Sequence, residues 1–134
     1  MEGKIKILMA DDEPDVLMIM AKKLREHGFE VIEATDGVDA WEKIQASRPD
    51  IVLLDLVMPR MDGFDVLKKL RQNPLDSKWR PVIIVSAKDE LADMQRGFSL
   101  EADHYVTKPC RIEDIIKGIN LMLKLIPQRR ISDE

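Results

Sequence analysis

Hydrophobic residues along this chain fall into two alternating patterns. Short runs that are almost wholly apolar occupy residues 7–10, 51–54 and 82–85, which is typical of strands buried on both faces of a parallel sheet. Between these runs, apolar residues recur every three or four positions, the spacing of one helix face. The first such segment, 16–24, is followed by Gly28, a common helix stop.

Together the patterns predict five strands that alternate with five helices. The expected strands cover residues 4–10, 29–34, 51–54, 81–85 and 104–107. The expected helices have their apolar positions within 16–24, 38–44, 64–70, 91–98 and 112–126. Because strand–helix–strand crossovers are right-handed, this alternation predicts an α/β fold with a doubly wound, five-stranded parallel sheet.

Length and composition narrow the possible function classes. The 134 residues suit one domain, expected over 1–126; Pro127 should end the last helix, leaving a polar tail at 127–134. With 21 basic and 25 acidic residues, the net charge of −4 argues against nucleic-acid or anionic-membrane binding as the main function. No apolar run approaches the ~20 residues of a membrane span. The single cysteine, Cys110, excludes an internal disulfide and favours a reducing compartment, so we expect a cytoplasmic protein.

Reactive side chains gather where the predicted strands end. Because parallel strands end at the same edge of a sheet, groups that are distant in sequence are expected to converge there. The set contains four carboxylates, one hydroxyl and one ammonium: Asp11, Asp12, Glu13, Asp55, Ser86 and Lys108.

This set of groups favours phosphoryl chemistry. Carboxylates brought close together repel unless a cation intervenes, and oxygen ligands without histidine or cysteine favour Mg²⁺ over zinc. Ser86 can donate a hydrogen bond to a phosphoryl oxygen, and Lys108 can neutralise its charge. Asp55, at the end of a buried strand, is then the natural nucleophile, and its product is an aspartyl phosphate.

The order and spacing of these motifs resemble the receiver domain of two-component response regulators. The resemblance covers residues 4–125, and it is carried by the motifs at 11–14, 55–59 with 61–63, 86–87 and 105–109. Each motif alone is weakly specific, but their combination, in order and at successive strand ends, is highly specific. The resemblance implies a flavodoxin-like (βα)5 fold with the strand order 2-1-3-4-5.

The resemblance also implies a role for each site residue. Asp55 would be the phosphoacceptor, and Lys108 would contact the phosphoryl group through its ammonium. Asp12 and Asp55 would bind Mg²⁺ (or Mn²⁺ as a substitute) together with the backbone carbonyl of Val57, and Asp11 would act through water. The bond between Lys108 and Pro109 would be cis, which proline tolerates.

Partners and switching follow from the same resemblance. A sensor histidine kinase or a histidine phosphotransfer protein would donate the phosphoryl group, and the domain would catalyse its own phosphorylation and dephosphorylation. Ser86 and Tyr105 would form a switch pair, although a serine such as Ser86, taken alone, is more often a helix N-cap. A protein partner or a second receiver would bind the fourth helix, last strand and fifth helix. No nucleic acid or membrane is expected to bind this domain.

Alternatives and one departure remain. An aspartyl-phosphate hydrolase acting on an external substrate would need a second acid two residues after the nucleophile, where Val57 cannot transfer a proton. A nucleotide- or flavin-binding module would need a glycine-rich phosphate loop, and neither common form occurs. A single-domain regulator and a receiver within a longer chain both stay open as alternatives.

The chain departs from the family pattern at Glu101, where receivers often carry glycine. Glu101 must either adopt a left-handed conformation or end the fourth helix differently.

Overall fold

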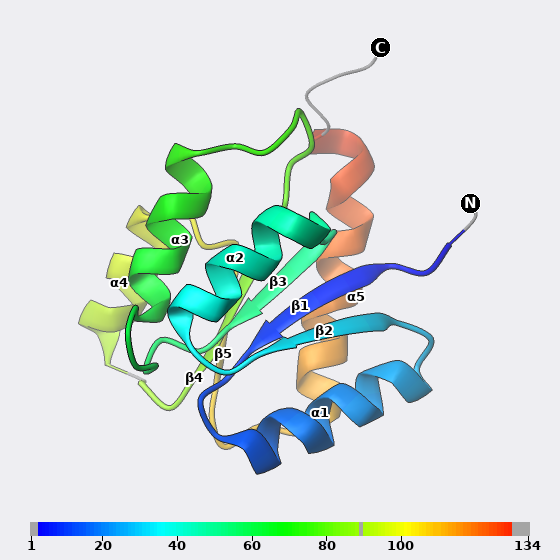
Figure 1. Cartoon of the computed structure of the whole chain (residues 1–134), viewed down its shortest axis with the longest axis horizontal. Helices are drawn as coiled ribbons and strands as arrows, with labels where there is room; N and C mark the ends of the chain where they lie inside the picture. The colour runs from blue at the N-terminus through cyan, green and yellow to red at the C-terminus, as the bar shows by residue number, and fades with distance from the viewer. Residues whose placement is uncertain (1–2, 89, 130–134) are drawn as a thin grey trace.

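The structure is a computed structural model that describes residues 3–88 and 90–129, without the side chains of 127–129. Ten elements alternate along the chain, as predicted (Figure 1). The strands are β1 (Lys6–Ala10), β2 (Glu30–Ala34), β3 (Ile51–Leu54), β4 (Val82–Ser86) and β5 (His104–Thr107). The helices are α1 (Pro14–Glu26), α2 (Gly37–Ser47), α3 (Gly63–Gln72), α4 (Leu91–Ser99) and α5 (Ile112–Arg129).

All five strands pair in parallel, in the order β2-β1-β3-β4-β5. Both the doubly wound fold and this strand order were predicted, and both are confirmed. Helices α1 and α5 cover one face of the sheet, while α2, α3 and α4 cover the other (Figure 1). Across the described residues, no helix is both long enough and apolar enough to cross a membrane.

Strand β3 lies at the centre of the sheet and is buried on both faces. Each of its four side chains is at most 1% exposed. Val52 and Leu54 pack in the cluster beneath α2 and α3, whereas Ile51 and Leu53 pack in the cluster beneath α1 and α5. Full burial of such side chains contributes roughly 1.5–3 kcal/mol each. The central strand therefore holds a fixed position, and so does the residue that follows it.

The last helix differs from the prediction. It continues through Pro127 to Arg129, so the expectation that Pro127 ends the helix was wrong. Proline lacks the N–H that would bond back one turn, but its fixed φ of about −65° is itself helical, so a final turn can continue past it. The rest of the expected tail, 130–134, lies outside the described residues.

The fourth helix resolves the alternative left open at Glu101. This residue adopts the left-handed conformation, with φ of 71°, just after the C-terminal end of α4. Among the residues of α4 only Gly97 is buried, and the apolar side chains of Leu91 and Phe98 are exposed. The apolar residues whose spacing predicted this helix therefore lie partly on the surface of the domain, and do not all face its core.

Gly63 offers a test of the packing around the loop that follows β3. Its backbone lies so close to this loop that a Cβ atom would overlap the carbonyl oxygen of Asp55 and lie 2.8 Å from the Cα of Leu56. We expect Gly63→Ala to lower the free energy of unfolding by about 2–3 kcal/mol, because backbone atoms cannot rotate away from the methyl group. Urea denaturation measures this change. Lys68→Ala, on the exposed side of α3, is the control and should change stability by less than about 0.5 kcal/mol; equal losses in both variants would contradict the close approach.

Candidate functional site

The ends of four neighbouring strands build the site. Asp11 and Asp12 directly follow β1, Asp55 follows β3, Ser86 is the last residue of β4 and Lys108 follows β5. The sheet's hydrogen bonding continues past the strands, because the Asp55 N–H donates to the Ala10 carbonyl at 3.1 Å and the Lys108 N–H donates to the Ser86 carbonyl at 2.8 Å. The backbone of these residues is thus fixed by the same ladder that holds the strands.

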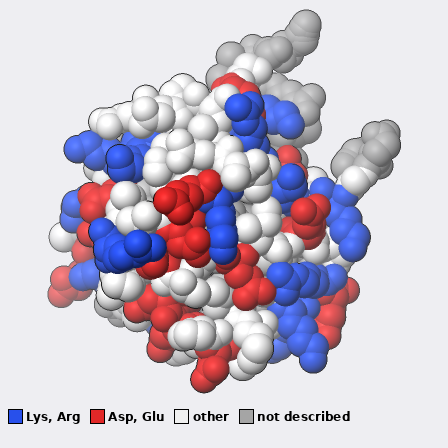
Figure 2. Space-filling model, in the orientation of Figure 1, with Lys and Arg blue, Asp and Glu red and all other residues white. Residues whose placement is uncertain are grey.

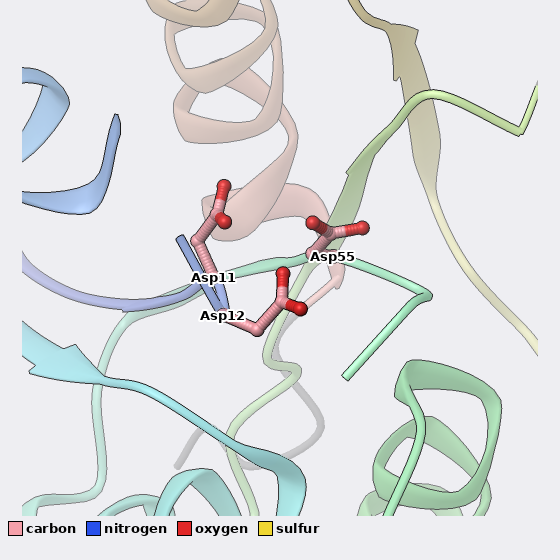
Figure 3. A group of neighbouring side chains, drawn as sticks. All are labelled: Asp11, Asp12 and Asp55. Atoms are coloured by element: carbon pink, nitrogen blue, oxygen red, sulfur yellow. The ribbon is translucent and has the colours of Figure 1, made fainter. Parts of the chain in front are cut away.

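Three carboxylates gather at this edge. Asp11, Asp12 and Asp55 each offer an oxygen atom within 4.8 Å of the others, as Figure 3 shows at the ends of β1 and β3. Asp11 and Asp55 are buried, at 2% and 6% exposure, and Asp12 is exposed. The predicted convergence of these residues is therefore present in the structure.

Lys108 links the two buried carboxylates. Its ammonium donates to Asp11 Oδ2 at 2.6 Å and to Asp55 Oδ2 at 3.1 Å. Burial by itself lowers the pKa of Lys108, but the hydrogen bond to Asp11 and the charge of Asp55 outweigh it, so the net pKa is raised above its ordinary value. Lys108 therefore stays protonated at neutral pH and acts as a fixed positive charge. The peptide bond between Lys108 and Pro109 is cis, as expected.

The charge of the cluster suits a divalent cation. Three carboxylates and one ammonium carry a formal charge of −2, and every candidate ligand is a hard oxygen. Both oxygens of Asp11 accept hydrogen bonds, from the Glu13 N–H at 2.9 Å and from Lys108 at 2.6 Å; both oxygens of Asp55 accept longer ones, from the Val57 N–H at 3.2 Å and from Lys108 at 3.1 Å. The residues present thus fit Mg²⁺, with the exposed Asp12 the most available carboxylate and Asp55 held by longer hydrogen bonds than Asp11.

The loop after Asp55 is held by a pair of residues that the sequence did not bring to notice. Arg60 has a φ of 68°, and its guanidinium donates to both carboxylate oxygens of Asp36 at 2.9–3.0 Å. Asp36 also caps α2 by accepting from the Asp39 N–H at 2.7 Å. This N–H, and then the Arg60 guanidinium, lower the pKa of Asp36 from its ordinary value. The pair connects the loop that carries Val57 to the start of α2. Because the two residues are 24 positions apart in the sequence, no local motif indicates that they interact.

The residues of the predicted switch pair, Ser86 and Tyr105, both form hydrogen bonds with the backbone of Lys88. The Lys88 N–H donates to the buried hydroxyl of Ser86 at 3.3 Å, and the Tyr105 hydroxyl donates to the Lys88 carbonyl at 2.5 Å. Helix α4 has Glu90 at its N-cap position, so Ser86 is not the cap that its sequence context alone allowed. Lys88 was missed in the sequence because its backbone, and not its side chain, joins the two residues.

Surface charge adds no second kind of site on the face shown in Figure 2. Lysine and arginine side chains lie there in small groups beside groups of aspartate and glutamate, so both signs are spread over the face. This mixture agrees with the small net charge of −4. An extended basic surface of the kind that binds nucleic acid is not present on this face.

Known proteins resemble this chain over most of its length, and they support the family resemblance seen in its motifs. The family model described as "Response regulator receiver domain" matches residues 7–120. The chain is 36% identical over 119 residues to the alkaline phosphatase synthesis transcriptional regulatory protein PhoP of Bacillus subtilis, covering 89% of this chain and 48% of that protein. It is 37% identical over 121 residues to the probable transcriptional regulatory protein TcrX of Mycobacterium tuberculosis, covering 90% and 50%. The chain thus spans about half the length of these curated relatives.

Solved structures agree in fold. The receiver domain of the Francisella response regulator 1452 superimposes with a TM-score of 0.82 at 33% identity, covering 90% of this chain and 98% of that one. A CheY-like receiver domain protein from Methanospirillum hungatei gives a TM-score of 0.85 at 25% identity, covering 95% and 98%.

Members of this family act as phospho-switches in two-component signal transduction, where they interact with histidine kinases and effector domains. The matched motifs, the strand order and the acidic cluster beside Lys108 all agree with that family. The chain belongs to the response regulator receiver domain family.

Proposed function

We propose that this chain is a phosphorylation-controlled signalling module in which Asp55 accepts a phosphoryl group. The donor would be a phosphohistidine on a sensor histidine kinase or on a histidine phosphotransfer protein. The observation that carries this proposal is the setting of Asp55, which is buried at the end of the central strand and shares the Lys108 ammonium with Asp11. A nucleophile held in this way has a counter-charge already in place for the group that it receives.

The proposed transfer breaks one bond and forms another. A carboxylate oxygen of Asp55 bonds to phosphorus while the phosphorus–nitrogen bond of the phosphohistidine breaks, and the released imidazole nitrogen takes up a proton. Lys108, 3.1 Å from Asp55 Oδ2, is placed to offset charge on the phosphoryl oxygens. Return to the starting state is hydrolysis by water, which yields inorganic phosphate and restores the carboxylate. We propose that the domain itself catalyses both steps.

Mg²⁺ is the proposed cofactor, and Mn²⁺ is an alternative ion. Asp12, Asp55 and the backbone carbonyl of Val57 would be its ligands, with Asp11 acting through a water molecule. The hydrogen bonds that the two Asp11 oxygens accept, at 2.9 Å and 2.6 Å, are shorter than those at Asp55, at 3.2 Å and 3.1 Å, which supports the indirect role of Asp11. When bound, the ion would supply further positive charge for the phosphoryl group.

We further propose that phosphorylation changes the face formed by α4, β5 and α5. A phosphoryl group offers strong acceptor oxygens, and Ser86 would turn its hydroxyl toward them. This rotation of the Ser86 side chain would break the hydrogen bond that it accepts from the Lys88 N–H. The Lys88 carbonyl, in the next peptide group, accepts the hydrogen bond from the Tyr105 hydroxyl. Changes at Asp55 would reach Tyr105 and α4 through this one backbone unit.

Apolar side chains make this face suitable for a protein partner. Leu91 and Phe98 of α4 are 70% and 48% exposed, and Leu121 of α5 is 46% exposed. Exposed apolar groups that gather on one side of a domain mark binding surfaces. The partner would be a downstream protein or a second receiver.

The matched relatives are named as transcriptional regulators, so we extend the proposal to control of transcription, through further domains or through a separate protein. We place this signalling in the cytoplasm, where a lone thiol such as Cys110 stays reduced.

Asp55→Asn should abolish labelling by a small phosphodonor such as acetyl phosphate in the presence of Mg²⁺. The amide is a poor nucleophile, and no other carboxylate ends the central strand. Intact-protein mass spectrometry measures the added phosphoryl mass, and alkali lability identifies an acyl phosphate. Asp65→Asn, an exposed aspartate of α3, is the control and should label normally. Alkali-stable labelling that persists in Asp55→Asn would refute the assignment.

Asp12→Ala should raise the Mg²⁺ concentration needed for half-maximal phosphorylation by roughly ten-fold or more, because the ion loses one of very few anionic ligands. Calorimetric titration with Mg²⁺ gives a second readout that does not depend on phosphorylation. Asp15→Ala removes an exposed carboxylate from the first turn of α1 and should leave both values unchanged. If Asp12→Ala bound Mg²⁺ like the parent protein, Asp12 would not be a ligand.

Beryllofluoride, a phosphoryl mimic, should change amide hydrogen exchange within 86–108 when it is added with Mg²⁺. The reason is the path from Ser86 through Lys88 to Tyr105. Asp55→Asn should not respond, since it lacks the carboxylate that holds the mimic. Changes confined to α1 would place the output surface elsewhere.

A further inference from the structure

Helix α4 is attached to the domain mainly through its C-terminal half. Gly97 is its buried residue, and a Cβ atom there would lie 2.8 Å from Cδ1 of Ile84, so the helix backbone rests directly on the sheet. The Arg96 guanidinium stacks over the ring of Phe64 in α3, 4.0 Å from its centroid. Leu91, at the other end of α4, is 70% exposed. The C-terminal half of this helix is therefore anchored on the sheet and on α3, and Leu91 at its start is exposed.

The anchored end contains a strained residue. Glu101 has a φ of 71°, a left-handed conformation that is unfavourable for an L-residue other than glycine. The turn closes when the Ala102 N–H donates to the Gly97 carbonyl at 3.0 Å, the bond typical of a Schellman helix end. Because Glu101 is not glycine, the surrounding structure must stabilise this turn.

Arg71, near the end of α3, provides that stabilisation. Its guanidinium donates twice to the Glu101 carbonyl, from Nε at 3.1 Å and from Nη2 at 2.9 Å. Nη1 donates to the Arg80 carbonyl at 2.8 Å, and Nη2 donates to Asp103 Oδ2 at 2.8 Å. The same Asp103 oxygen accepts from the Val82 N–H at 2.8 Å. One side chain thus joins α3, the start of β4 and the turn between α4 and β5.

The two charged side chains of this group are largely buried, whereas the hydrogen bonds to the Glu101 carbonyl lie at the surface. The side chains of Arg71 and Asp103 are only 16% and 13% exposed. Burial lowers the pKa of Arg71 from its ordinary value against the opposing charge of Asp103, but an arginine remains protonated in proteins. Hydrogen bonds made by a buried charged group are stronger than those between neutral groups, and losing the donor leaves the Glu101 carbonyl and the Asp103 carboxylate without it.

From these contacts we propose that Arg71 is a positioning residue that holds the C-terminal end of α4 as a fixed pivot by clamping the left-handed Glu101 turn. Changes that begin at Lys88 then move the N-terminal end of α4, while residues 97–102 stay in place. This reading of the motion rests on the proposed function, whereas the clamp itself does not.

A lysine cannot replace this arginine. The clamp needs donors that reach two carbonyl groups and one carboxylate at once, which the planar guanidinium provides and a single ammonium does not. Arg25 of α1 supplies a matched control, because it also lies in the last turn of a helix and binds a backbone carbonyl and a carboxylate. Its Nη2 donates to the Val31 carbonyl at 2.9 Å and lies 3.0 Å from Glu33 Oε2.

The test is amide hydrogen exchange on the whole chain, comparing the parent protein with Arg71→Ala, Arg71→Lys and Arg25→Ala. Without any phosphoryl mimic, Arg71→Ala should speed exchange of residues 97–102 by about ten-fold or more, and Arg71→Lys should lie between the parent and Arg71→Ala. Exchange in β1 and β3 should not change, and Arg25→Ala should leave 97–102 unaffected. Unchanged exchange at 97–102, or equal acceleration throughout the chain, would overturn the proposal.

Chemical rescue separates positioning from a general loss of packing. Arg71 lines an open pocket of about 480 Å³, together with its partners Glu101 and Asp103. Millimolar ethylguanidinium should enter the space left in Arg71→Ala and restore slow exchange at 97–102, and it should have no effect on the parent protein. Absence of rescue in a folded Arg71→Ala would count against the clamp.

Beryllofluoride with Mg²⁺ tests the pivot. In the parent protein it should alter exchange near residues 88–95 and leave 97–102 unchanged, and in Arg71→Lys the change should extend into 97–102. A parent response centred on 97–102 would overturn the pivot. If the mimic changed nothing in the parent, the proposed function would fail, while the comparison without the mimic would still decide the role of Arg71.

Discussion

Two buried carboxylates beside one ammonium determine the character of this domain. Asp11 and Asp55 repel each other, and Lys108 is the cation that holds them together. Removing one partner from a buried ion pair typically costs about 3–5 kcal/mol, because the remaining charge is left uncompensated. The cluster nevertheless keeps a surplus of negative charge that one ammonium cannot balance. The site is therefore electrostatically favourable to a cation.

The centre of the sheet is rigid, whereas helix α4 at its edge is weakly attached, and the two regions have different roles in the domain. Strand β3 is enclosed by the two hydrophobic clusters, so Asp55 is held in place by the bulk of the core. Helix α4 buries little, and its fixed points are a glycine contact, an arginine over a ring and the Glu101 turn. Chemistry that needs exact placement is located at the centre, and the element proposed to move is located where motion disturbs few contacts.

Much of the fold could be predicted because local pattern and tertiary structure agree. The fully apolar runs are strands buried on two faces, and the strand ends bring Asp11, Asp55 and Lys108 together as parallel topology requires. Errors arose where one residue is overruled by its surroundings, as when α5 continues past Pro127. Backbone links such as the one at Lys88, and distant pairs such as Asp36 with Arg60, leave no trace in spacing or residue type. The metal ligands and the switch pair remain predictions.

The shallow attachment of α4 also has an evolutionary consequence. Since Gly97 is the one buried residue of this helix, several of its other positions, such as Leu91, Ala92 and Gln95, are exposed to solvent. Substitutions at exposed positions usually change stability by less than about 0.5 kcal/mol, so selection for folding hardly constrains them. Duplicated copies of such a gene can therefore acquire different surfaces on this helix, and with them different partners, while the acceptor chemistry on the neighbouring strands is inherited unchanged.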